Sequence, residues 1–165
     1  MARRIFYSFH YKPDNWRAAQ VRNMGVIEGN RPATDNEWET ITRSGDEAIK
    51  RWIADQMFGT SCAVVLIGTH TANRKWINHE IIEAWNSGKG LLGVYIHNLK
   101  NREQNQSLKG NDPFDYITFG TNGKKMSSFV RTYDPPYLSS TEVYSYINQN
   151  LAYWVEDAIR IRDSN

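Results

Sequence analysis

Two continuous apolar runs constrain the fold of this chain of 165 residues more than any other feature. Residues 61–68 read SCAVVLIG and residues 90–96 read GLLGVYI, and each run follows a stretch with helical periodicity. A strand that is apolar on both faces must be buried on both faces, which is typical of a parallel sheet between two layers of helices. The two runs therefore predict an α/β fold.

A third buried strand is predicted over residues 4–11, which read RIFYSFHY with bulky side chains at both alternating sets of positions. Pro13 is expected to end this strand, and Asp14 is expected to cap a helix that begins at Asn15. The expected buried positions of that helix are Trp16, Ala19 and Val21.

Helix signals recur further along the chain. Ser44 and Glu47 match the capping box, so a helix is predicted over residues 45–58. Residues 28–39 contain Gly, Pro, Asp and Asn and are expected to form a long loop before it. Another helix is expected between the cap Asn73 and Gly88. The buried positions predicted for the helix over 45–58 are Ile49, Trp52, Ile53 and Met57.

The pattern loosens after the second apolar run. Residues 98–112 are polar without a period and are expected to form an exposed insertion. Strands are predicted over residues 116–119 and 128–133, with a turn at 122–123 between them. A final helix is predicted from about residue 140, and one apolar stripe should pack it on the sheet. The stripe consists of Val143, Ile147, Leu151, Trp154 and Ala158.

This order of elements predicts a three-layer α/β fold with a mainly parallel sheet, formed by one domain over residues 1–165. The strands over 4–11, 62–68 and 91–96 are expected to be its central neighbours. Right-handed crossovers bring the loops after these strands to one edge of the sheet. Ligands of such folds bind at that edge.

Composition excludes several classes of function. Lys and Arg number 20 and Asp and Glu number 18, so a formal net charge of +2 gives no electrostatic case for a nucleic-acid binder. The longest apolar run, residues 63–67, is far shorter than the ~20 residues that span a bilayer, and the first residues lack signal-peptide features. Cys62 is the only cysteine, which excludes an internal disulfide and a cysteine-based zinc site. We expect a cytoplasmic protein.

Four familiar sites do not fit the sequence. The first strand lacks the acidic pair of a phosphoreceiver, and the nucleophile elbow G-x-S-x-G is absent. Residues 120–125 (GTNGKK) have the wrong spacing for a phosphate-binding loop and fit a hairpin turn better. The four histidines have no mutual metal-ligand spacing, so no metal site is expected.

The remaining candidate is the pair formed by Trp76 and Glu80, in the helix that follows the central strand. Residues four apart share one face of a helix, so the indole and the carboxyl group project together near the ligand-binding edge. The simpler interpretation is that Trp76 packs on the sheet and Glu80 is a solvated helix acid. Spacing alone favours this simpler interpretation.

A family resemblance changes that balance. Residues 4–10 resemble the first strand of Toll/interleukin-1 receptor (TIR) domains. Residues 73–81 (NRKWINHEI) and the strand LLGVYI resemble NAD-consuming TIR domains, whose motif is Trp-x-x-x-Glu. The FYSFHY start, the LIG segment and NDPFDY over 111–116 are similar to the TIR-like ThsB proteins of the bacterial Thoeris anti-phage system. The resemblance covers residues 3–119 and implies a TIR-like, flavodoxin-like fold.

The resemblance implies an NAD-processing enzyme in which Glu80 is catalytic and Trp76 stacks on the nucleotide. Ser8, Phe9 and His10 are then expected to line the same pocket. Without the resemblance, Phe9 fits a core position and His10 an ordinary loop residue. NAD is the implied substrate, and the chemistry needs neither a cofactor nor a metal nor a covalent nucleophile.

The resemblance further implies a cyclic ADP-ribose-type product that activates a partner effector protein. Trp38 lies in the 28–39 segment, where TIR domains carry a loop used for self-assembly into homo-oligomers; it also fits an ordinary packing position. The alternative function is a non-enzymatic TIR-like interaction module. Such a module has no need of a carboxylate behind Trp76.

Overall fold

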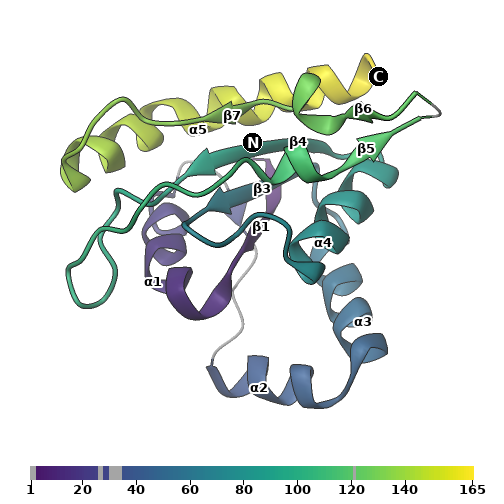
Figure 1. Ribbon diagram of the computed structural model, residues 1–165, viewed down its shortest axis with the longest axis horizontal. Coiled ribbons are helices and arrows are strands. Elements are labelled where there is room, and N and C mark those ends of the chain that lie inside the picture. The colour runs from purple at the N-terminus through teal and green to yellow at the C-terminus, as the bar shows by residue number, and fades with distance from the viewer. Residues whose placement is uncertain (1–2, 26–27, 30–34, 121) are drawn as a thin grey trace.

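A five-stranded sheet forms the centre of the computed structural model (Figure 1), with the order β2-β1-β3-β4-β7 and parallel pairing throughout. Its strands are β1 (Arg4–Phe9), β2 (Glu28–Gly29), β3 (Cys62–Ile67), β4 (Gly90–Tyr95) and β7 (Thr132–Tyr133). The prediction of three central, neighbouring, parallel strands is confirmed by β1, β3 and β4.

The structure describes residues 3–25, 28–29, 35–120 and 122–165. The side chains of residues 28–29 and 35–38 lie outside this description. No helix among the described residues is long and apolar enough to cross a membrane.

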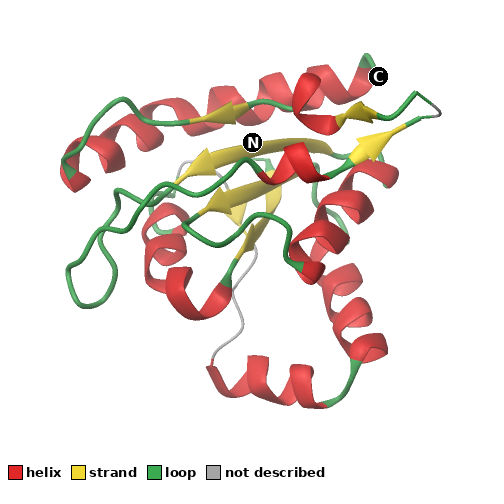
Figure 2. Ribbon diagram, in the orientation of Figure 1, coloured by secondary structure: helices red, strands yellow, loops and turns green. Residues whose placement is uncertain are grey.

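Two helical layers cover the two faces of the sheet (Figure 2). One core joins the sheet to α1 (Tyr11–Arg22) and α5 (Ser140–Asp163). The other joins it to α3 (Asp46–Met57) and α4 (Lys75–Asn86). Every residue of β3 is buried, because alternate side chains enter the two cores. This is the three-layer α/β fold that the apolar runs predict.

The final helix also agrees with its prediction. The helix α5 begins at Ser140, and the Ser139 side chain accepts a hydrogen bond from Glu142 N–H at its start. All five residues of the predicted stripe are buried against the sheet. Figure 1 shows α5 extending along the whole sheet.

The first helix differs from its prediction. The helix α1 begins at Tyr11 rather than Asn15, and β1 ends two residues before the predicted end of the strand. Pro13 is accommodated because the first turn of a helix has no internal partners for its N–H groups. Asp14 is not a cap: it is buried and paired with Arg17. Of the expected buried positions, Val21 is buried, Ala19 is half-buried and Trp16 is 46% exposed.

The segment before α3 also differs. A helix, α2 (Asp35–Arg43), occupies part of the predicted loop and lies beside α3, away from the sheet (Figure 1). The predicted helix over 45–58 is confirmed as α3, but its capping box is wrong. Ser44 Oγ donates to Thr40 O instead, and Gly45, with φ 92°, precedes the helix. Three of the residues predicted to be buried in this helix, Ile49, Ile53 and Met57, are buried. The fourth, Trp52, is half-buried.

The region after β4 contains the largest topological correction. The predicted pairing of residues 116–119 with residues 128–133 is wrong. The strand β5 (Thr118–Phe119) pairs with β6 (Lys124–Lys125) instead, in an antiparallel hairpin. Two short 3₁₀ helices flank the hairpin, η1 (Pro113–Tyr116) and η2 (Met126–Ser128). The later segment instead supplies β7, which joins the main sheet beside β4. Residues 98–112 contain no helix or strand, yet Leu99 is buried.

Candidate active site

The loop between β3 and α4 places the Trp76–Glu80 pair at the carboxyl edge of the sheet. Gly68 N–H donates to Thr71 Oγ1 at 2.8 Å, which turns the chain directly after β3. Asn73 adopts a left-handed conformation with φ 61°, and Arg74 rather than Asn73 precedes the first residue of α4. The first two turns of α4, which carry Trp76 and Glu80, therefore lie near the residues that follow β1, Phe9 and His10 among them.

A cavity of ≈ 720 Å³ opens at this edge. Four of the predicted pocket residues line it together, and Ser8 is buried beside it. The four are Phe9, His10, Trp76 and Glu80. Cavities of this size are typical of small-molecule sites.

Glu80 is the most unusual residue of this cavity. Only 8% of it is exposed, and burial raises the pKa of its carboxyl group to about 8. The Ser8 hydroxyl faces this carboxyl group and partly opposes the rise in its pKa. The two do not meet in hydrogen-bond geometry, because Ser8 Oγ is buried without a partner. The cavity thus contains a buried carboxyl group, and a buried hydroxyl without a hydrogen-bond partner lies beside it.

His10 provides a further unpaired group. Its Nδ1 is buried without a hydrogen-bond partner. Burial, and then the charges of Arg74 and His70, lower the pKa of His10 to about 4. A neutral imidazole therefore faces the cavity at neutral pH, and it can exchange a hydrogen bond with a bound molecule.

Aromatic rings form two of the cavity walls. Trp76 is half-buried and contacts the edge of His79 at 5.5 Å between ring centroids, while Lys75 Nζ lies 4.9 Å from the indole centroid. Phe9 and Tyr11, which also line the cavity, stack with their planes 25° apart. Flat walls of this kind suit a planar ring system.

Sequence reasoning missed several lining residues, namely Tyr11, Lys12, His70, Arg74, Lys75 and Tyr116. They lie in loops or first helical turns, where periodicity carries no signal, and Tyr116 comes from η1, far along the chain. Among the described lining residues Glu80 is the one carboxylate, whereas Lys12, Arg74 and Lys75 are cations. Lys75 is paired with Asp46, so Lys12 and Arg74 are the cations that favour an anionic ligand, while Glu80 offers a buried carboxyl group.

The backbone of Trp38 is part of α2, but the structure does not describe its side chain. Its predicted role in assembly stays a prediction. Within the described part of the chain, no group of three or more His, Cys, Asp or Glu side chains is arranged to hold a metal ion.

This arrangement suits chemistry at a sugar carbon. A buried carboxylate stabilises a positive charge that develops beside it, because the low dielectric strengthens the interaction. A carboxylate beside the ribose can stabilise an oxocarbenium-like state, and an aromatic ring can orient the ligand. Glu80 and Trp76, one helical turn apart on α4, provide both.

Comparison with known proteins identifies the family of this chain. Residues 6–101 match the family model "Thoeris protein ThsB, TIR-like domain". The chain is also similar to a protein of Bacillus cereus (strain MSX-D12) named "Putative cyclic ADP-D-ribose synthase ThsB1". The two are 35% identical over 139 residues, which cover 80% of this chain and 72% of that protein. The chain therefore belongs to the TIR-like ThsB family of the Thoeris system.

Proposed function

We propose that this chain is an NAD-processing enzyme of bacterial anti-phage defence. It cleaves the bond between nicotinamide and ribose in NAD and releases a cyclic ADP-ribose-type signal, which activates an effector protein in the cytoplasm. The observation that carries the proposal is the buried Glu80 carboxyl group beside Trp76 in an open cavity. The name of the Bacillus cereus relative supports the type of product.

In the proposed reaction the electron pair of the glycosidic bond leaves with nicotinamide, which becomes neutral, and positive charge develops on the ribose. The ionised Glu80 carboxylate stabilises that charge. The cationic nicotinamide ring of the bound substrate favours ionisation of Glu80, because an opposite charge nearby lowers the pKa of a carboxyl group. Free enzyme and substrate should therefore react faster as the pH rises toward 8.

Cyclisation requires a nucleophile from the ADP-ribose itself. That group attacks the anomeric carbon in place of water and loses its proton. Ser8 and His10 supply the unpaired polar atoms on this side of the cavity. We assign them to hydrogen bonds with the ribose hydroxyls and with the carboxamide of the substrate, and Phe9 and Trp76 to its planar rings.

The competing function is a non-enzymatic interaction module that acts through TIR–TIR contacts. The Glu80 environment argues against it, because burying a carboxyl group with a raised pKa lowers stability and gives no benefit to an adaptor. Self-assembly and catalysis are compatible, however. We infer that Trp38 and its neighbours contribute to a homo-oligomer of the active enzyme.

The deciding experiment is incubation of the protein with NAD, alone and with a lysate of phage-infected cells, followed by mass spectrometry of the products. Glu80→Gln keeps the size of the side chain and removes its charge, so product formation should fall by ~10²–10³-fold. Glu83→Gln, one turn further along α4 and outside the cavity lining, is the matched control and should retain activity. No product from the wild type, alone and with the lysate, would favour the interaction module. A folded Glu80→Gln protein with undiminished product would show that Glu80 is not the catalytic residue.

A further inference from the structure

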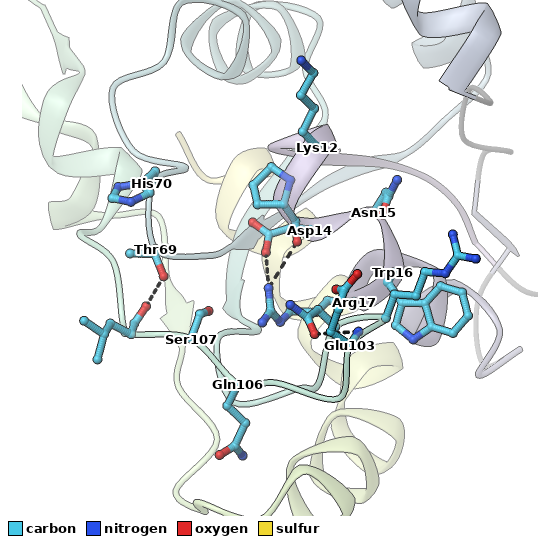
Figure 3. Close-up of a pocket in the computed structure, with 14 residues that line it drawn as sticks. Lys12, Asp14, Asn15, Trp16, Arg17, Thr69, His70, Glu103, Gln106 and Ser107 are labelled. Atoms are coloured by element: carbon cyan, nitrogen blue, oxygen red, sulfur yellow. Dashed lines mark hydrogen bonds and ion pairs between the residues drawn. The ribbon is translucent and has the colours of Figure 1, made fainter.

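A second cavity, of ≈ 620 Å³, adjoins the first. The two cavities share Lys12 and His70 in their linings, so they form neighbouring parts of one surface groove. Figure 3 shows this second cavity, with His70 at one end, Trp16 at the other and Lys12 extending away from the Asp14–Arg17 pair. Its walls come from the start of α1, the loop after β3, and residues 101–108.

Buried hydrogen bonds from Arg17 hold residues 99–105 against the start of α1. Arg17 donates from Nε to Leu99 O at 2.8 Å and from Nη2 to Asn105 O at 2.9 Å. Its Nη1 donates to Asp14 Oδ1 at 2.9 Å, and both side chains are at most 3% exposed. Asn101 Oδ1 accepts from two N–H groups of the same segment, which closes it into a turn. The cavity is thus preformed rather than created by loose loops.

The groups that remain available in this cavity match the parts of a nucleotide. Lys12 and Arg102 take part in no ion pair among the described residues, while the charge of Asp14 is compensated by Arg17. Trp16 exposes 46% of its surface there instead of packing in the core. Glu103 supplies one exposed carboxylate.

We propose that this second cavity binds the ADP half of the substrate, an inference that rests on the proposed function. Trp16 stacks on the adenine ring, and Glu103 accepts hydrogen bonds from the adenosine ribose hydroxyls. Arg102 and Lys12 bind the diphosphate, with Lys12 at the boundary between the two cavities. The nicotinamide ribose then lies beside Glu80. One protomer would thereby bind the whole dinucleotide along the groove.

Titration with ADP tests the proposal directly, because ADP contains no bond for Glu80 to cleave. Isothermal titration calorimetry on the full chain should show saturable ADP binding. Arg102→Ala and Trp16→Ala should each weaken that binding by about tenfold, as expected for one charge-assisted phosphate contact or one stacked base. Arg43→Ala and Phe58→Ala are matched controls outside the groove and should bind ADP like the wild type.

Two results would overturn the proposal: no saturable ADP binding by the wild type, or wild-type binding by both groove variants. Failure of the proposed function gives a different pattern. In that case the wild type would form no product from NAD, or Glu80→Gln would retain product formation, whatever the ADP titration shows. Glu80→Gln should bind ADP normally if both proposals hold, because Glu80 lines only the first cavity.

Discussion

The carboxyl group of Asp14 packs directly against Gly68. A β-carbon on residue 68 would overlap Asp14 Oδ2, and it would lie 2.7 Å from Cγ and 2.8 Å from Oδ1. This contact joins the first turn of α1 to the residue that follows β3. Two of the segments that line the groove are therefore held together at one point, and the site depends on the absence of a side chain at residue 68.

Gly68→Ala should lower the free energy of unfolding by about 1–3 kcal/mol, the usual cost of overpacking a buried position. Urea denaturation measures this cost. A double-mutant cycle provides the control: in an Asp14→Ala background the carboxyl group that overlaps the new methyl group is gone, so Gly68→Ala should cost much less there. Equal costs in both backgrounds would show that the two residues are not coupled.

Asp14→Asn should be more destabilising than its small change in structure suggests. It leaves the Arg17 guanidinium buried without a charged partner, which typically costs about 3–5 kcal/mol. Asp46→Asn removes the partner of Lys75 in an exposed ion pair and should change stability little. Chemical denaturation of the two variants side by side makes the comparison, and similar stability losses would contradict it.

Glu80 gives a pH dependence with a defined sign. Its pKa in the folded protein is about 8 and its ordinary value is 4.5, so the unfolded chain ionises first as the pH rises. The stability contributed by its proton is fully present below pH 4.5 and is lost as the pH rises through 8, by up to about 1.4 kcal/mol per pH unit. Glu80→Gln should therefore gain stability relative to the wild type between pH 5 and pH 8. Urea melts at each pH test this, and a constant difference would refute it.

Trp76→Ala should mainly weaken NAD binding. Loss of one stacking surface typically costs about 1–3 kcal/mol, so KM for NAD should rise roughly tenfold or more while kcat changes less. Trp76→Phe keeps an aromatic face and should restore much of the affinity. Trp85 lies further along α4 against Phe119 and Phe129, outside both cavities, so Trp85→Ala should lower the melting temperature without this KM effect.

Trp38→Ala tests the assembly role assigned to this part of α2. The free energy of unfolding should stay nearly unchanged, while sedimentation should show weaker self-association of the activated protein. A loss of several kcal/mol, as expected for truncation of a core tryptophan, would make Trp38 a packing residue instead.

Local patterns in the sequence predict the three-layer architecture and the Trp76–Glu80 pair. The apolar runs of β3 and β4 are apolar on both faces, so both faces of these strands must be buried. The apolar stripe of α5 must likewise pack against another apolar surface, here the sheet. The spacing of Trp76 and Glu80 places both on one face of α4 wherever that helix lies. These features follow from local periodicity, which the chain carries in its residue order.

Tertiary structure decided the features that depend on contacts between distant segments. Asp14 fits a helix cap in the sequence, and only its burial against Gly68 and Arg17 shows that it is an internal ion-pair partner. Trp16 is apolar enough for the core, yet it is exposed, because packing turns the face of α1 that carries Asp14, Arg17, Ala18 and Val21 toward the interior. The raised pKa of Glu80 likewise arises from desolvation by neighbouring segments, a property that no residue spacing contains.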